Sequence, residues 1–358
     1  MKELSSYFHE TGKDFDDFAL IRETLESKTY VRNVNFNKQK VSLWLFMDVT
    51  ENDEIYVLKL DEEIIDSIGK WRPSFDAGAL QNKAKMDGKK LPTEILEDIK
   101  NGTIPIAIET EGHFMFCDQN CISRFTPKLG IQFSLIYEKN YIGMMALYSA
   151  LKSYSDVLVL NIRYDEGYRR VMSVMSEKTV YHAAAPIVKK MCIQTGFSFK
   201  AYDITQYRTK VVLDGETIGN YHFFIRMDFS DTGHGNEKYL LCIRPVNGRN
   251  FFAGIVLQKF KMDEISQMLA LKEKVKNLLL TSDKIISGKQ KILKSRGLKT
   301  AIGKKRLAGI DKELVEGTDL LLYLVELPEK IGSINNTSDR GLAESAGELF
   351  LELLNIAV

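Results

Sequence analysis

Apolar and polar residues alternate with two different periods along this chain of 358 residues. Residues 12–26 place apolar side chains at helical spacing, with acidic residues in the first turn. Strand-like stretches rich in Val, Leu, Phe and Tyr follow at Thr29–Phe36, Lys40–Val49 and Glu54–Leu60. Thr103–Glu109 and His113–Cys117 flank a polar turn, as the two strands of a hairpin do. The first third of the chain therefore predicts a mixture of helices and strands.

The middle of the chain is rich in strand patterns. Residues 221–229 alternate strictly, with aromatic and aliphatic side chains on one face and His222, Phe224, Arg226 and Asp228 on the other. Further strands are expected at Ile131–Tyr137, Val157–Tyr164, Tyr168–Ser176, Lys238–Pro245 and Asn250–Phe260, and one or two strands at Phe197–Leu213. Helices are expected at Tyr141–Lys152 and at Tyr181–Thr195, before Gly196. An antiparallel sheet with a few helices is the simplest fold for this order.

From Met262 onward the apolar spacing is helical. The whole pattern predicts an α+β fold with a central antiparallel sheet, flanking helices and a helical C-terminal region. At this length two or three domains are expected. We place an acidic α+β domain at residues 1–125, a central β-rich domain at 126–261 and the helical region at 262–358.

Composition narrows the class of protein. The chain is 44% hydrophobic and 27% charged, which is typical of a soluble globular protein. No apolar window approaches the roughly 18 residues of a membrane span, and the N-terminus lacks the apolar core of a signal peptide. Four cysteines are too few for a disulfide scaffold. We therefore predict a cytoplasmic protein without membrane contact.

Charge is sorted along the chain although the net charge is only +1. Split after residues 120, 258 and 312, the segments carry formal charges of −8, +6, +10 and −7. A basic body between acidic ends indicates a polyanionic ligand or an acidic protein surface. Acidic ends beside a basic body also suit head-to-tail assembly of copies of the chain.

The basic segment, residues 284–306, contains nine Lys or Arg and no acid. Apolar residues lie between the cations, so one face could dock on the protein while the other follows phosphates. A solvated helix face kept soluble by lysines is the alternative, although such faces usually mix both signs. The cations we select as nucleic-acid ligands are Lys289, Lys291, Lys294, Arg296, Lys299, Lys304, Lys305 and Arg306.

A second group of cations and aromatic residues lies in the middle region, near predicted hairpin turns. Stacking rings interleaved with cations suit single-stranded nucleic acid. The alternative is that Tyr and Arg simply favour half-exposed strands. From this group we select Arg163, Arg169, Arg170, Lys189, Lys190, Tyr207, Arg208 and Lys210, with Tyr164, Tyr168 and Tyr202 as neighbouring rings.

Two constellations could carry other chemistry. His113, Cys117 and Cys121 are zinc-ligand types, but their spacing fits no standard site, so no metal or other cofactor is predicted. Residues 230–236 place Asp231 and His234 in a Gly-containing loop, which favours a turn over a catalytic pair. The chain has no phosphate-binding loop and no nucleophile elbow.

Three short motifs carry a family resemblance over about 40% of the chain. Residues 168–173 (YRRVMS), residues 229–233 (FSDTG) and Arg244 with Asn247–Gly248 resemble elements of the phage/plasmid-like proteins of unknown function. Departures are Asp228 and Phe229 where that family has Asn, Cys242 before rather than after Arg244, and the absence of its later Arg-His element. The resemblance implies a mobile-element origin rather than an activity.

Three functions are consistent with this sequence. The first is a non-enzymatic nucleic-acid-binding protein, with single-stranded DNA as the expected ligand and self-assembly as a further expectation. The second is a phage-encoded inhibitor or structural component whose basic face meets an acidic protein. The third is an enzyme with an unfamiliar site around Asp228, Asp231 and His234; no catalytic residue is assigned, because no nucleophile or metal quartet accompanies them.

Overall fold

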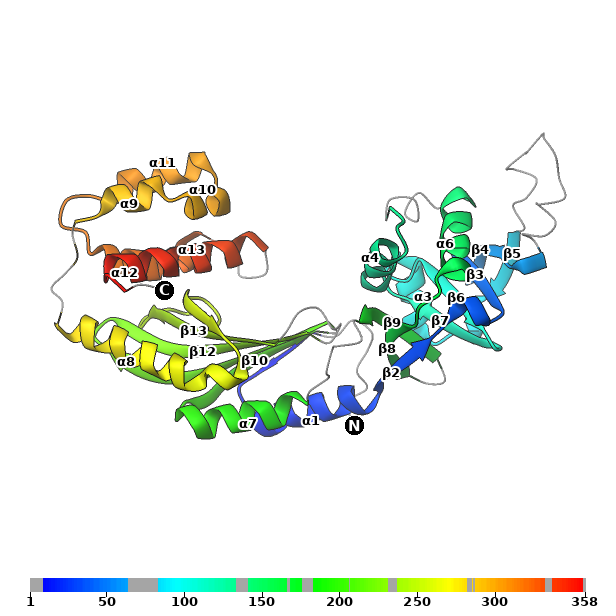
Figure 1. The fold of residues 1–358 in the computed structure, drawn as a ribbon, viewed down its shortest axis with the longest axis horizontal. Helices are drawn as coiled ribbons and strands as arrows, with labels where there is room; N and C mark the ends of the chain where they lie inside the picture. Colours follow the sequence, from blue (N-terminus) through cyan, green and yellow to red (C-terminus); the bar gives the residue numbers. More distant parts are fainter. Residues whose placement is uncertain are drawn as a thin grey trace.

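The computed structural model describes residues 9–63, 83–132, 141–165, 168–175, 183–205, 207–230, 237–281, 285, 287–331 and 337–356. These residues form an α+β fold on two β-sheets, with a helical C-terminal region, so the predicted fold class is confirmed. Figure 1 shows the two sheets next to each other along the long axis of the molecule. Within the described ranges, no helix combines the length and apolar character that crossing a membrane requires.

The eight-stranded sheet holds most of the N-terminal half of the chain. In spatial order its strands are β2 (Thr29–Val34), β8 (Leu158–Asp165), β9 (Tyr168–Met175), β7 (His113–Cys117), β6 (Ile106–Thr110), β3 (Val41–Val49), β4 (Glu54–Leu60) and β5 (Lys83–Asp87). Neighbouring strands are antiparallel except β7 and β9, which run parallel. Helices α4 (Gln119–Lys128) and α6 (Tyr141–Ser153) bury one face, and α3 (Thr93–Lys100) buries the other.

The six-stranded sheet is antiparallel throughout. Its strands are β1 (His9–Gly12), β10 (Ser198–Thr205), β11 (Arg208–Ile218), β12 (Tyr221–Ser230), β13 (Lys238–Pro245) and β14 (Ile255–Phe260), in that spatial order. The strict alternation in β12 has the predicted result. Phe223 and Ile225 are buried in the main core with side chains of α1 (Phe15–Ser27), α7 (Ala184–Thr195) and α8 (Ile265–Thr281). The alternate positions form the opposite face, which carries the charged residues.

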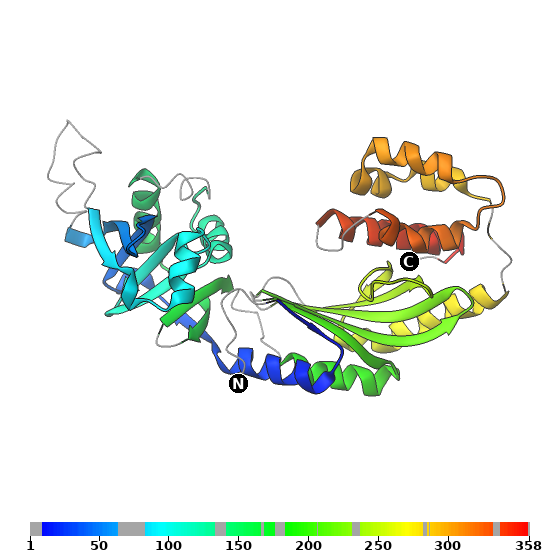
Figure 2. The ribbon, with the colours of Figure 1, turned by 180° about the vertical axis from the view of Figure 1, so that it is seen from behind.

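The C-terminal helices lie on the other side of this sheet from α7 and α8 (Figures 1 and 2). They are α9 (Lys289–Lys294), α10 (Arg296–Ile302), α11 (Lys304–Glu313), α12 (Leu320–Ile331) and α13 (Thr337–Leu353). Helix α13 lies against the edge strand β14. A Cβ atom at Gly347 would be 1.8 Å from the Val256 carbonyl oxygen, so only glycine permits this approach. The helix therefore covers an edge that could otherwise pair with another strand.

The N-terminal segment belongs to both sheets. Strand β1 pairs with β10, and Phe18 of α1 packs 5.5 Å and 5.7 Å, ring centre to ring centre, from Phe199 and Tyr202 of the six-stranded sheet. The chain then enters β2 of the eight-stranded sheet. That sheet also takes in β8 and β9, so the predicted boundary between residues 125 and 126 does not separate the two sheets.

One strand prediction needs correction, and most of another lies outside the described residues. The strand predicted at Asn250–Phe260 begins at Ile255, because residues 246–254 cross from β13 to β14 as turns and loop. Of the strand predicted at Ile131–Tyr137, residues 133–137 lie outside the described residues. The hairpin of β8 and β9 is confirmed, with its ladder running from Val159–Met175 to Asp165–Tyr168.

Candidate functional site

The basic segment forms an outer layer of short helices. Its apolar residues Ile292 and Leu298 are buried in the main core, as are Leu307 and Ile310, which follow the segment in α11. Figure 1 shows α9, α10 and α11 stacked on α12 and α13, on the side away from the sheet. The amphipathic character expected of this segment is therefore present, and its polar side faces outward.

Cations on this layer divide into paired and unpaired groups. Lys294, Arg296, Lys299 and Arg306 are exposed, and none forms an ion pair with a residue in the described part of the chain. By contrast, Lys291 Nζ lies 3.2 Å from Glu352. Side chains of Lys304 and Lys305 lie outside the described residues.

Lys289 has a structural role that the sequence did not indicate. Its ammonium group donates hydrogen bonds to the backbone carbonyls of Asp311 and Leu314 at 3.0 and 2.8 Å, and pairs with the Asp311 carboxylate at 2.9 Å. The terminal carbonyls of a helix have no partner within that helix, so Lys289 caps the end of α11. Its nitrogen is thus already engaged and is not a free phosphate ligand.

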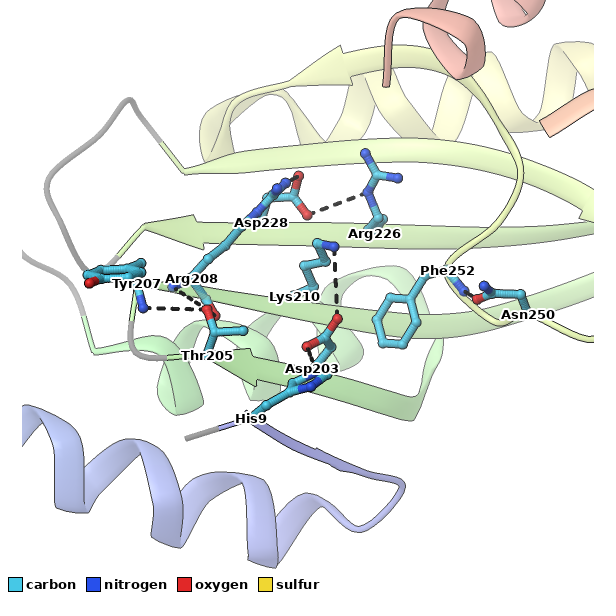
Figure 3. Close-up of polar contacts among 10 residues, drawn as sticks. All are labelled: His9, Asp203, Thr205, Tyr207, Arg208, Lys210, Arg226, Asp228, Asn250 and Phe252. Atoms are coloured by element: carbon cyan, nitrogen blue, oxygen red, sulfur yellow. Dashed lines mark hydrogen bonds and ion pairs between the residues drawn. The ribbon is translucent and has the colours of Figure 1, made fainter. Parts of the chain in front are cut away.

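A second charged surface lies on the polar face of the six-stranded sheet, which we call the charged face. In the register of the sheet, Asp203 on β10 lies opposite Lys210 on β11, and Lys210 lies opposite Asp228 on β12. Arg226 precedes Asp228 by two residues and so points to the same side. Figure 3 shows these side chains with Arg208 and His9. Sheet pairing thus brings together residues that are up to 219 positions apart.

The carboxylates of this charged face each hold at least one cation. Arg208 donates to Asp228 Oδ2 at 2.5 Å, and Arg226 Nε lies 3.4 Å from Asp228 Oδ1. Asp203 Oδ1 lies 2.9 Å from His9 Nε2, while Lys210 Nζ is 3.8 Å from Asp203 Oδ2. Only the Arg208 and His9 contacts have hydrogen-bond length.

The charged side chains around Asp228 differ in burial, and burial affects the pKa of Lys210. The side chains of Arg226, Asp228 and Lys210 are 8%, 5% and 11% exposed, whereas that of Arg208 is 43% exposed. Burial lowers the pKa of Lys210, and the nearby Arg208 lowers it further, against the opposing effect of Asp203 and Asp228. The cluster therefore consists of a buried inner part and an accessible cation at its rim.

A neighbouring part of the charged face is built on Asp214. Its carboxylate lies 2.7 Å from His222, 2.9 Å from Arg244 and 3.3 Å from Lys200. Arg244 and Lys200 also lie 5.2 Å from the ring centre of Phe251, in cation–π geometry. One carboxylate thus holds three basic side chains.

Two predicted nucleic-acid residues are instead structural. Arg170 is buried and donates to Asp98 and to Asp118, whose side chains are fully buried. Tyr207 donates to Asp118 Oδ2 at 2.6 Å. Neither guanidinium nor phenol is therefore free to meet a phosphate or a base. Tyr202 is also buried, at 4% exposure.

The remaining predicted ligands lie on separate surfaces. Arg163 and Arg169 are half-buried on β8 and β9 of the eight-stranded sheet. Lys189 and Lys190 are exposed on α7, which lies on the other side of the six-stranded sheet from α9–α11. Only Arg208 and Lys210 are brought together on the charged face. The sixteen predicted residues thus do not form one continuous site.

No metal site emerges among the described residues, which contain no cluster of three or more His, Cys, Asp or Glu that could hold an ion. His113 is exposed at the start of β7, and Cys117 is buried at its end. Four residues of strand span about 13 Å, which is too far for shared coordination. Burial raises the pKa of Cys121 well above its ordinary value, and it raises that of Cys242 to about 12, so neither favours the thiolate form.

Of the residues in the catalytic alternative, Asp228 is the one that the structure describes. Its carboxylate contacts Arg208 and Arg226. Asp231 and His234 lie outside the described residues.

Sequence reasoning placed His222 and Arg226 on one face of their strand without selecting them as site residues, and it missed His9, Asp203, Asp214 and Arg244 as members of the charged face. The available signal was the strict alternation of β12, which places His222, Arg226 and Asp228 on one face. Pairing with β10, β11 and β13 could not be read from that alternation.

Comparisons with protein-family models, with curated proteins and with solved structures find no match to this chain. The resemblance to the phage/plasmid-like proteins, and the mobile-element origin that it implies, therefore stay predictions.

Proposed function

We propose that this protein binds nucleic acid through backbone phosphates, using the exposed cations of α9–α11. The observation that carries the proposal is the set of four exposed cations of the basic segment, Lys294, Arg296, Lys299 and Arg306, without an acidic partner among the described residues. A face that serves only solubility usually mixes both signs. Phosphates would supply the missing anions, and the released counterions would add to the binding free energy.

The charges at the helix starts support the same proposal. None of α9, α10 and α11 has an acidic residue in its first turn, and the first turn of α11 begins with Lys304, Lys305 and Arg306. The helix dipole disfavours cations at this end and favours anions. A phosphate bound at these outer helices would compensate for the unfavourable position of the cations at the start of α11.

Single-stranded DNA remains the ligand that we propose, but stacking on the predicted tyrosines does not support it. Tyr202 is buried and Tyr207 is hydrogen-bonded to Asp118. Recognition would then depend on the backbone rather than on bases. We expect little dependence on base sequence, and a duplex of the same length tests the preference for single strands.

The decisive experiment compares two triple variants by fluorescence anisotropy with a labelled oligo-dT at several salt concentrations. Lys294→Glu, Arg296→Glu and Lys299→Glu together should abolish most binding. With four phosphate contacts, the wild type should show a slope of log K against log salt of about −3. The matched control is Lys38→Glu, Lys40→Glu and Lys89→Glu, which changes the net charge equally at exposed positions of the N-terminal third.

The control variant should bind nearly as well as the wild type. Equal loss in both variants would mean that net charge alone governs binding. No binding by the wild type at low salt would contradict the proposal, and retention by an acidic protein column under the same conditions would favour the protein-partner alternative.

A further inference from the structure

The charged face contains two mostly buried cations whose contacts with carboxylates are long. Lys210 Nζ is 3.8 Å from its nearest carboxylate oxygen, and Arg226 Nε is buried without a hydrogen-bond partner among the described residues. Their closest carboxylate contacts, at 3.8 and 3.4 Å, are too long for hydrogen bonds of ordinary strength. Native proteins normally satisfy buried charged groups, so two such groups on one face call for an explanation.

The local charge balance is also incomplete. Three cations, Arg208, Lys210 and Arg226, face two carboxylates, Asp203 and Asp228. Asp228 Oδ2 is taken by Arg208 and Asp203 Oδ1 by His9. Lys210 and Arg226 occupy diagonal positions on adjacent antiparallel strands, and the charge of Arg226 contributes to lowering the pKa of Lys210, after the larger effects of burial and Arg208. One further anion would balance the charge of the third cation and could accept a hydrogen bond from Lys210.

We propose that the charged face of the six-stranded sheet binds one phosphate group, held by Lys210 and Arg226 from below and by Arg208 at the rim. Phosphate fits this set because it offers several acceptor oxygens to donors arriving from different directions. A guanidinium fork pairs with two of those oxygens, and a lysine ammonium serves as a point charge. Asp203 and Asp228 orient the cations rather than contact the anion.

The surroundings suit a phosphate that is part of an organic molecule. Arg208 is the most exposed of the three cations, so the phosphate would enter from its side. Phe252 packs on the apolar part of the same face, against the cluster that contains Val212 and Phe224. Its ring is drawn with the charged side chains in Figure 3. A free nucleotide and a nucleic-acid backbone share this phosphate chemistry. The site is separate from α9–α11 and does not depend on them.

The test uses the full-length protein and follows its melting temperature and calorimetric heat with inorganic phosphate, a nucleoside 5′-monophosphate and an oligo-dT, at constant ionic strength. Phosphate should raise the melting temperature of the wild type. Lys210→Met should raise the melting temperature without ligand, because it removes a mostly buried charge whose nearest carboxylate oxygen is 3.8 Å away. The same change should weaken phosphate binding by at least about tenfold, as expected from losing a charge-assisted hydrogen bond.

Lys272→Met is the matched control. The Lys272 side chain is 13% exposed, close to the 11% of Lys210, but its nitrogen lies 2.7 Å from Glu216. This variant should lose stability and keep the phosphate response. Arg226→Met provides a second variant that should lose the response if Lys210→Met changes the fold.

The ligand that changes the melting temperature identifies the source of the bound anion. A response to the nucleotide and inorganic phosphate assigns the site to a free ligand, and a response to oligo-dT alone assigns it to a nucleic-acid backbone. No phosphate response in the wild type would overturn the proposal, as would an equal response in Lys210→Met. Binding of a glutamate-rich peptide in place of phosphate would overturn it in favour of a carboxylate ligand. The triple change on α9–α11 should leave phosphate binding intact, so the two proposals can fail independently.

Discussion

The hydroxyl of Tyr207 donates a hydrogen bond to Asp118 Oδ2 across 2.6 Å, and this bond joins the two sheets. Tyr207 directly precedes β11 of the six-stranded sheet, and Asp118 directly follows β7 of the eight-stranded sheet. The same Asp118 oxygen accepts from Arg170 at 2.8 Å, and Arg170 also pairs with Asp98. Two residues predicted to meet nucleic acid therefore belong to a hydrogen-bond network inside the protein.

Replacing Tyr207 with Phe should weaken the coupling of the two sheets. The change removes one hydrogen bond to a carboxylate, so we expect the free energy of unfolding to fall by about 1–3 kcal/mol. Urea denaturation measures this difference. Tyr164→Phe is the control, because Tyr164 is 46% exposed and should change stability by less than about 0.5 kcal/mol. Equal effects of the two changes would show that the Tyr207 bond adds nothing.

Replacing Arg170 with Met should be far more damaging. It would leave the fully buried side chains of Asp98 and Asp118 without their shared cation. Removing one partner of a buried ion pair typically lowers the free energy of unfolding by about 3–5 kcal/mol. Adding Asp98→Asn and Asp118→Asn to this variant should recover part of the loss, as measured by thermal denaturation. If the added changes lower stability further, the charges are not what Arg170 compensates.

At Arg170 the sequence predicts the local strand but not the distant residues that the side chain contacts. Its neighbours along β9 predict a strand correctly, because side-chain alternation is a local property. Its partners are 72 and 52 residues away, and only the parallel pairing of β7 with β9 brings Asp118 near it. Cations near hairpin turns looked exposed from the sequence, whereas pairing in the sheet buries this one.

In the outer helices α9–α11, unlike at Arg170, the sequence pattern did indicate which side chains are buried. The acid-free basic segment is a local feature, and the apolar residues at helical spacing within it, such as Ile292 and Leu298, are buried as its amphipathic pattern predicts. What the sequence did not show is which cations find partners. Lys291 meets Glu352, and Lys289 meets the end of α11, because of how separate helices pack. Packing of distant segments also places strands from both sides of the predicted boundary at residues 125–126 in one sheet, since β8 and β9 pair in the sheet that contains β2 and β3.

Asp214 should make stability depend on pH under acidic conditions. Burial alone would raise its pKa, but the hydrogen bond from His222 and the charges of His222, Arg244 and Lys200 together hold the pKa below its ordinary value. A carboxyl whose folded pKa is depressed contributes stability above its unfolded pKa, about 3.9, and that contribution is lost as the pH falls through the folded pKa.

We therefore expect Asp214→Asn to lower the melting temperature at pH 6, and the difference from the wild type to shrink below about pH 4. Melting curves over this pH range provide the measurement. Asp263→Asn is the control, because Asp263 is exposed and forms no ion pair with the described residues. A gap between wild type and Asp214→Asn that stays constant with pH would contradict the assigned cause.

Lys289 and Lys294 allow capping of a helix to be separated from binding of a ligand. They are both in α9, but the Lys289 ammonium holds the end of α11, whereas Lys294 is exposed without a recorded ion pair in the described part of the chain. Lys289→Met should lower the free energy of unfolding by about 1 kcal/mol, because two terminal carbonyls lose a charged donor. Lys294→Met should leave stability unchanged and weaken binding to oligo-dT, with a smaller salt dependence. Urea denaturation and anisotropy on both variants measure the two properties. The reverse pattern, with Lys289→Met impairing binding at unchanged stability, would show that the α11 cap does not form in solution.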